Sequence, residues 1–384
     1  MRDAVIVAAL RTPVGKRNGS LSAVHPADLG AVVLRELVLR TGIEPAIVDD
    51  VIWGCVSQVG EQSFNIGRTT VLSAGWPDSV PATTVDRQCG SSQQALHFAA
   101  AGVSSGQYDV AVAGGDESMS RVPMGSATGA ASPLGAMYEA RYSGAIPQQG
   151  LGAERIAREW GLSRRTLDEF AAQSHAKAAA AADAGRFVEQ IVPVTLADGR
   201  VFGADEGIRR GSTAETLAGL APAFLPDGVL HAGNSSQISD GAAAVLVMTS
   251  ERAIELGLTP LARVHTAVLA GADPEIMLTA PIPATRRALE RSGLELDAIG
   301  AFEINEAFAC VPLAWLHEFP VDPDTVNPNG GAIALGHPLG GSGARLTTTL
   351  LHHMQAHNVR YGLQTMCEGG GLANATIFEL LTGS

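Results

Sequence analysis

One cysteine stands in a setting that favours nucleophilic chemistry. Cys89 follows a β-permissive approach at 83–85, precedes a turn of small residues at 90–92, and lies just before a predicted helix from Gln93 to about Ala101. The N-terminus of a helix carries unpaired N–H groups and favours negative charge. Because the thiolate is the reactive form of cysteine, we expect this position to lower the pKa of Cys89. A free cysteine is more often a small buried hydrophobe, so the prediction depends on partners elsewhere in the chain.

Three side chains in the last third of the chain are of the types that would complete such a site. A neutral imidazole at His337 can accept the proton of the Cys89 thiol. A second thiol, Cys367, can act first as an acid and then as a base. Asn305 can hold a water or a carbonyl group without ionising. The backbone N–H groups of Cys89 and Gly369 are candidates for an oxyanion hole.

Alternating strands and helices are expected to position these residues. Continuous apolar runs predict strands that are buried on both faces, and segments with helical spacing separate them. The expected strands cover 4–9, 51–56, 108–115, 242–248, 262–270, 301–304 and 361–370, and the expected helices cover 27–40, 65–74, 153–160, 165–184 and 282–293. This order indicates an α/β sheet with helices on both faces. Gly114 and Gly115 are expected to end their strand in a turn.

The later part of the chain repeats the element order of the first part. Segment 361–370 echoes 108–115, and each follows a helix that opens on small residues, which is a weak internal duplication. Loops at corresponding strand ends of two packed, similar halves face each other. We therefore expect Cys89 to meet the glycine-rich turns of the second half. The stretch 119–239 interrupts the first half, and an insertion of this size usually carries function or subunit contacts.

The composition limits the classes of function. The chain has 384 residues, of which 46% are hydrophobic and 17% charged, which is enough for a large core and more than one structural unit. A net charge of -13 argues against general binding of nucleic acid or of an anionic membrane, although local arginines can still hold a phosphate-bearing ligand. No apolar run approaches the roughly 20 residues of a spanning helix, and the start of the chain does not read as a signal peptide.

The cysteines and histidines outside the candidate site favour structural roles. The four cysteines are far apart and form no CxxC pair, which fits free thiols in a reducing cytosol, so a cytoplasmic protein is expected. Cys55 and Cys310 have no partner motif and are predicted to be core residues. His352, His353 and His357 lack neighbours with ligand spacing, so no metal site is expected. Asp116 and Glu117 are adjacent and are expected to be structural.

Five short motifs occur in one order along the chain. They are the segment around Cys89, Arg11-Thr12-Pro13, Asn305-Glu306-Ala307-Phe308, Gly336-His337-Pro338 and Cys367-Glu368-Gly369. With them the chain resembles the thiolase family over essentially its whole length. The segments 233–236 and 240–243 also look like the family's entry into the last strand of the first half.

The resemblance implies a fold and a division of the chain. It implies a five-layered αβαβα core made of two similar βαβαβαββ halves. The first half would comprise residues 1–118 with about 240–250, and the second would comprise 251–384. Residues 119–239 would form a loop domain that covers the active site and contributes to coenzyme A binding.

The resemblance also implies an activity, which is CoA-dependent thiolytic cleavage of a 3-oxoacyl-CoA by an acetyl-CoA C-acyltransferase in fatty-acid or sterol side-chain β-oxidation. Cys89 would be the acylated nucleophile and Cys367 the acid and base. His337 would activate Cys89 and, with a water held by Asn305, stabilise the enolate. The N–H groups of Cys89 and Gly369 would hold the acyl oxygen.

The same resemblance implies partners. Arg209 matches a position that contacts the CoA nucleotide, and Ser236 matches one that contacts pantetheine. Coenzyme A would be a co-substrate, with no permanently bound cofactor. The family is usually dimeric or tetrameric, so a homodimer or homotetramer is expected.

Some positions depart from the family's pattern. Asp86 stands where Asn is common, and Ser92 and Gln237 stand where Gly is common. Ser92 and Gln237 could narrow the pocket or add hydrogen bonds. His231 replaces a small polar residue, and the sequence gives no account of it.

Other functions stay open at this point. A cysteine hydrolase could use Cys89, His337 and Asn305 as a triad, but it would not need Cys367. A catalytically inactive scaffold of the same fold and a condensing enzyme of the same superfamily are further alternatives, and so is a short-chain acetoacetyl-CoA thiolase. Against the last, the His-Met-Gly of short-chain members is replaced by Pro147-Gln148-Gln149-Gly150, which predicts a longer or bulkier acyl group.

Overall fold

The computed structural model describes residues 2–129, 131–142 and 148–381. Up to the insertion, the elements are β1 (Val5–Arg11), β2 (Gly15–Lys16), α1 (Pro26–Thr41), β3 (Asp50–Gly54), α2 (Ile66–Ser73), β4 (Ala82–Val85), α3 (Ser91–Ser105) and β5 (Val110–Ser118). The insertion holds α4 (Ala136–Arg141), α5 (Gln149–Glu159), α6 (Arg164–Asp183), β6 (Val194–Thr195), β7 (Val201–Phe202) and α7 (Ala214–Ala218). After it come β8 (Ser239–Met248), α8 (Ser250–Glu255), β9 (Ala262–Gly271), α9 (Pro281–Ser292), β10 (Ala301–Ile304), α10 (Cys310–Glu318), α11 (Ala332–Leu335), α12 (Leu339–His357), β11 (Tyr361–Glu368) and β12 (Leu372–Leu380).

All strands except the β6–β7 pair form one large mixed sheet with the order β10-β11-β12-β9-β1-β8-β5-β3-β4, and β2 pairs with β8. The two halves of the chain meet where β1 pairs with β9, and that pairing involves only Val5 with Arg263 and Ile6 with Ala262. Beyond this short seam the two parts of the sheet separate. Each part can therefore be covered on both faces by helices.

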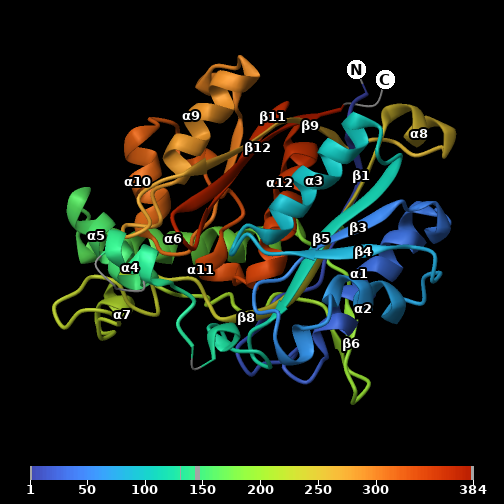
Figure 1. Ribbon diagram of the computed structural model, residues 1–384. Coiled ribbons are helices and arrows are strands. Elements are labelled where there is room, and N and C mark those ends of the chain that lie inside the picture. The colour runs from blue at the N-terminus through green and yellow to red at the C-terminus, as the bar shows by residue number, and fades with distance from the viewer. Residues whose placement is uncertain (1, 130, 143–147, 382–384) are drawn as a thin grey trace.

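Helices lie in three layers around the two parts of the sheet (Figure 1). One core cluster packs the apolar face of α1, including Leu29, Val33 and Leu37, on the first part. A second cluster places α3 and α12 between the two parts, with Leu96 and Leu350 among its members. A third cluster packs α9 and α10 on the far face of the second part. The expected five-layered αβαβα arrangement is confirmed.

The internal duplication is visible in the strand order. In the first half β3, β5, β8 and β1 are neighbours, and in the second half β10, β11, β12 and β9 repeat that order. In the second half, the counterpart of β4 is reduced to one parallel bridge between Phe302 and Val326. The two candidate thiols lie on different halves, at the ends of β4 and β11. Cys89 follows the first of these strands, and Cys367 lies in the second.

One local prediction is wrong. Gly114 and Gly115 do not end their strand in a turn, because β5 continues through them to Ser118. A Cβ at Gly115 would lie 2.3 Å from the carbonyl oxygen of Gly340, so the glycine allows α12 to approach the sheet closely. Small residues inside a strand here reflect packing rather than chain reversal.

The insertion contacts both halves. Its helices α5 and α6 share a core cluster with Phe308 and Cys367 of the second half. On the other side, the guanidinium of Arg11 donates two hydrogen bonds to Asp205, at 2.7 and 2.9 Å, and both side chains are buried. In the described residues, no helix is long and apolar enough to cross a membrane.

Candidate active site

Cys89 lies in a tight turn between β4 and α3. The turn is closed by the N–H of Gly90, which donates to the carbonyl of Arg87 at 3.1 Å, and Gln88 adopts a positive φ of 48°. α3 begins at Ser91, with Gly90 as its N-cap. A non-glycine residue with positive φ is uncommon, so the backbone is held in this shape to present the cysteine.

The expected lowering of the Cys89 pKa is wrong. Burial, with the nearby carboxyl of Glu368, raises the pKa of the Cys89 thiol to about 12. The N–H groups of Cys89 and Gly369 hydrogen-bond to the sulfur and oppose this rise without cancelling it. Desolvation therefore outweighs the effect of the helix N-terminus. The resting group is a thiol, and it needs a base.

Hydrogen bonds around His337 determine which of its two ring nitrogens can accept a proton. Its Nδ1 lies 2.6 Å from the Oγ of Ser342, and that hydroxyl donates to the carbonyl of Pro338 at 2.8 Å. Because the hydroxyl has one proton, Nδ1 must carry the imidazole proton and Nε2 is left as the acceptor. Burial, with the positive charge of Arg345, lowers the pKa of His337 to about 3. The imidazole is neutral at physiological pH, as predicted.

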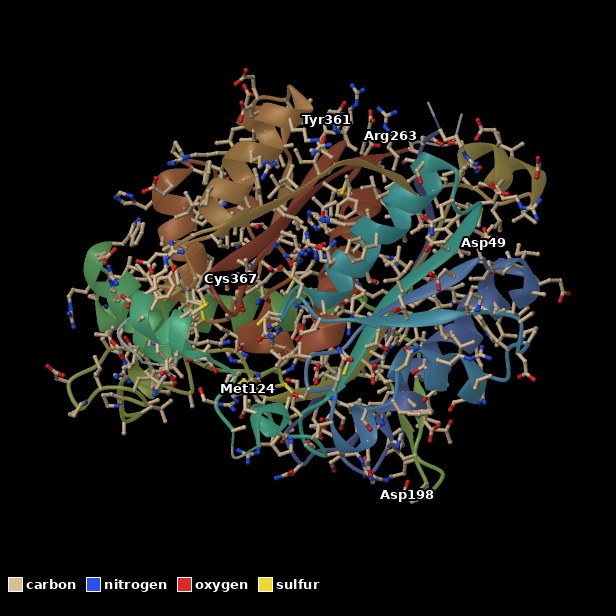
Figure 2. All side chains as sticks on the ribbon, viewed as in Figure 1. Asp49, Met124, Asp198, Arg263, Tyr361 and Cys367 are labelled. Carbon is tan, nitrogen blue, oxygen red and sulfur yellow. The ribbon has the colours of Figure 1, made fainter. Side chains whose placement is uncertain are left out.

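Asn305 and Cys367 complete the group. The Nδ2 of Asn305 lies 3.4 Å from the Nε2 of His337, and its buried Oδ1 has no hydrogen-bond partner among the described residues. Cys367 is fully buried near the end of β11, in the interior of the molecule (Figure 2). Burial, then the proximity of Cys89, raises the pKa of Cys367 well above its usual value. The two thiols thus lie close together in a low-dielectric region.

A cavity of about 460 Å³ opens onto this group. Cys89, His337 and Ser236 line it, whereas Asn305 and Cys367 lie behind its wall. The insertion supplies much of the lining; the full set is Cys89, Met119, Met124, Gln148, Gln149, Gly150, Phe224, Ser235, Ser236, Gln237, Ile238, Ala307, Phe308, His337 and Leu339. Arg209 is exposed and does not line this cavity.

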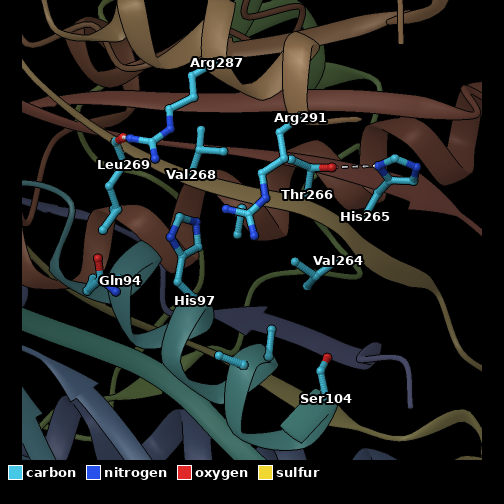
Figure 3. A pocket seen from close by; sticks show the side chains of 13 residues that line it. Gln94, His97, Ser104, Val264, His265, Thr266, Val268, Leu269, Arg287 and Arg291 are labelled. Carbon is cyan, nitrogen blue, oxygen red and sulfur yellow. Dashed lines mark hydrogen bonds between the residues drawn. The ribbon is translucent and has the colours of Figure 1, made fainter. Parts of the chain in front are cut away.

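Two other cavities differ in their relation to this site. One of about 570 Å³ is lined by Gln88, Gly369, Leu134, Tyr138 and Met277, and it shares Gln149 with the first. Another, of about 560 Å³, lies between α3, β9 and α9, where His97 faces Arg287 and Arg291 (Figure 3). None of the predicted site residues lines this last cavity, so it is separate from the cysteine site.

The positions that depart from the family's pattern have structural roles. The Oγ of Ser92 accepts a hydrogen bond from the N–H of Ala344 at 2.9 Å and joins α3 to α12. Gln237 lines the cavity and donates from Nε2 to the carbonyls of Gly207 and Ile333.

The Asp86 carboxylate accepts the N–H of Gln88 at 2.6 Å and so stabilises the nucleophile turn. His231 is buried, with its Nε2 2.7 Å from Asp168 Oδ1, while its Nδ1 accepts from Gly233. It therefore anchors the segment that leads to Ser236.

The sequence reasoning missed two residues at the site. Ser342 fixes the tautomer of His337, and its place one turn into a helix after His337 was the available signal. Glu368 is fully buried beside the nucleophile turn, and its carboxylate oxygens have no partner among the described residues. The glycines that follow Glu368 indicate a turn, and nothing in the local sequence indicates a role for Glu368 itself.

The family models match almost the entire chain. The thiolase N-terminal domain matches residues 4–251, and the thiolase C-terminal domain matches residues 258–380. The chain belongs to the thiolase family. This thiolase is 51% identical over 390 residues to the steroid 3-ketoacyl-CoA thiolase FadA6 of Mycobacterium tuberculosis, a match that covers 99% of this chain and 95% of the relative.

Two other relatives are similarly complete matches. The thiolase is 47% identical over 390 residues to the 3-ketoacyl-CoA thiolase FadA of Escherichia coli K12, with 99% of this chain and 100% of the relative covered. The crystal structure of the Bacillus anthracis acetyl-CoA acetyltransferase superposes with a TM-score of 0.91 at 40% identity, covering 99% of each chain. The resemblance inferred from five motifs is confirmed.

Proposed function

We propose that this thiolase cleaves a 3-oxoacyl-CoA with CoA, giving acetyl-CoA or propionyl-CoA and a shortened acyl-CoA. The observation that supports this most directly is the presence of two thiols, Cys89 and Cys367, beside one neutral imidazole and one cavity. Two of the relatives carry the name 3-ketoacyl-CoA thiolase.

The first half of the proposed reaction forms an acyl-enzyme. His337 Nε2 takes the proton of Cys89, and the sulfur attacks the 3-oxo carbon of the substrate. The bond between C2 and C3 breaks, and its electron pair becomes the enolate of the departing thioester. His337 and a water held by Asn305 stabilise that enolate, and Cys367 gives C2 its proton.

The second half transfers the acyl group to CoA. Cys367, now a thiolate, takes the proton of the CoA thiol, and the CoA sulfur attacks the acyl carbon on Cys89. The N–H groups of Cys89 and Gly369 stabilise the oxyanion. The sulfur of Cys89 leaves and recovers its proton from His337. Both thiols return to their starting state, so atoms and protons balance over the cycle.

We assign the CoA contacts from the family resemblance, and the lining of the cavity supports the assignment of Ser236 only. Ser236 lies on the wall and would contact the pantetheine arm, while Arg209, exposed outside the cavity, would meet the nucleotide phosphates. Residues 119–239 would form the loop domain over the site. The division into halves at 1–118 with about 240–250, and at 251–384, stays a proposal.

A medium, long or bulky acyl group is the proposed substrate class. Met124 and Phe224 border the first cavity, and Leu134, Tyr138 and Gly369 border the second. Small residues dominate the rest of the covering segment. Met137, 91% exposed, lines neither cavity, and Pro147 lies outside the described residues.

We further propose a cytoplasmic homodimer or homotetramer. The four cysteines are all free and buried, and the reaction needs Cys89 and Cys367 reduced, which a reducing compartment ensures. A β-oxidation role is consistent with this placement.

The competing function is hydrolysis by Cys89 and His337. The test is to mix the enzyme with a 3-oxoacyl-CoA and measure loss of substrate with and without free CoA. Thiolysis predicts loss that depends on CoA and yields two acyl-CoA products. Equal loss without CoA, with a free acid as product, would assign the protein to hydrolysis instead.

A further inference from the structure

A buried carboxyl group that the proposed reaction does not use lies directly behind the nucleophile. Glu368 follows Cys367 on β11 and points to the opposite side of the strand, toward Gly90. A Cβ at Gly90 would lie 1.9 Å from Glu368 Oε1, so the side chain fills the space that any residue larger than glycine would need. Glu368 therefore packs against the peptide next to Cys89.

A second acceptor oxygen converges on the same point. Asn374 Oδ1 lies 2.7 Å from that Cβ position, and, like both oxygens of Glu368, it is buried without a well-formed hydrogen bond among the described residues. The orientation of this amide is fixed, because its Nδ2 donates to the carbonyl of Gly90 at 3.2 Å. Two buried acceptors side by side are costly unless a proton lies between them.

We propose that Glu368 is a positioning residue that acts as a neutral carboxylic acid: it donates to Asn374 Oδ1, supports the Cys89 turn, and weakens the nucleophile when it ionises. In this arrangement the acid, the amide of Asn374 and the carbonyl of Gly90 form one hydrogen-bonded chain. The proposal adds a group to the reaction proposed above, but it depends only on the chemistry of Cys89.

The electrostatics of the site agree with this role. Burial raises the pKa of Glu368 to about 8, against the positive charge of Arg87 and the backbone N–H of Asn374, which lower it, and with a smaller contribution from Asp86. These are the charged groups that face it, together with the thiols Cys89 and Cys367. As the pH rises through about 8, a negative charge appears beside Cys89 and disfavours its thiolate. His337, with a pKa of about 3, does not titrate in this range.

The test measures alkylation of Cys89 by iodoacetamide in the free enzyme, followed by mass spectrometry of the peptide that carries it. The ratio of the Glu368→Gln rate to the wild-type rate should be close to one at about pH 6.5, where residue 368 is uncharged in both proteins. At about pH 9.5 the ratio should rise to about ten, because ionised Glu368 is expected to raise the pKa of Cys89 by about one unit. Because no CoA substrate is used, the result does not depend on thiolysis.

The control is Glu303→Gln. Glu303 is also fully buried with a pKa raised to about 8 by burial, yet it belongs to β10 and faces Arg345. Its ratio should stay near one at both pH values. A Glu368→Gln ratio that is the same at both pH values would overturn the proposal, because a purely structural role changes both rates together.

A second variant keeps the proposal testable if Glu368→Gln does not fold. Arg87→Gln removes the positive charge that favours ionisation of Glu368, so the onset of weakening should move to higher pH. This variant should react faster than the wild type at about pH 8.5 and equally at about pH 6.5. A slower reaction at about pH 8.5 would contradict the proposed charge state.

Discussion

The Nδ1 atom of His337 lies 2.6 Å from the Oγ of Ser342, one turn further along the chain at the start of α12. The Ser342 hydroxyl in turn donates a hydrogen bond to the carbonyl of Pro338. This relationship decides which ring nitrogen is free to accept a proton from Cys89. The first prediction follows from it.

Replacing Ser342 by alanine should lower kcat about tenfold, a part of the 10²–10⁴ that general base catalysis typically contributes. The imidazole loses the partner that holds its proton on Nδ1. The measurement is steady-state thiolysis, with binding of CoA to the variant determined by calorimetry. Ser342→Thr keeps a hydroxyl and serves as the control. If CoA binding weakens as much as kcat, the residue supports the pocket rather than the tautomer.

From the low pKa of His337 we predict how the rate of acyl-enzyme formation depends on pH. The base is active when neutral, so its protonation lowers the rate of acyl-enzyme formation only as the pH falls toward about 3. From about pH 7.5 to 5.5 the rate in a rapid-mixing experiment should hardly change. A histidine with an ordinary pKa near 6.5 would lose about tenfold over that interval. A tenfold loss would show that His337 is solvated in the working enzyme.

The acyl specificity should increase with chain length. Each buried methylene contributes about 0.8 kcal/mol, so kcat/KM for thiolysis should climb about fourfold per methylene until the cavities are full. The measurement is a series of 3-oxoacyl-CoA substrates from short to long, with one ring-bearing acyl group included. A maximum at acetoacetyl-CoA would assign the enzyme to the short-chain class.

A stability prediction concerns the attachment of the insertion. Arg11→Met leaves Asp205 as an unpaired buried charge, which should cost about 3–5 kcal/mol of the free energy of unfolding. Arg210→Met breaks a similar two-point contact with Asp183, but both of those side chains are largely exposed, so its effect on stability should be far smaller. Denaturant titration of the two variants compares them. Equal losses would mean that burial does not control the strength of this pair.

Much of the fold could be predicted because its signals are local. The apolar runs that form β1, β3 and β8 are buried on both faces, as their composition predicts. Gly115 was misread because the contact that requires a glycine comes from Gly340, more than two hundred residues away. No local pattern records such a contact.

The chemistry of the site was only partly predictable for the same reason. The type and order of Cys89, Asn305, His337 and Cys367 can be read from the chain, and the structure brings them together. The pKa of Cys89 could not be read, because desolvation depends on what both halves of the molecule place around it. Glu368 was invisible as a functional candidate until its packing on Gly90 was known.

The central claim is that Cys89 carries the acyl group. The most direct measurement is intact-protein mass spectrometry after brief mixing with a 3-oxoacyl-CoA, in the absence of free CoA. We predict a mass increase equal to one shortened acyl group in the wild type, located on the peptide that contains Cys89, and its absence in Cys89→Ala. An adduct that persists in Cys89→Ala, on Cys367 for example, would contradict the assignment of the two thiols.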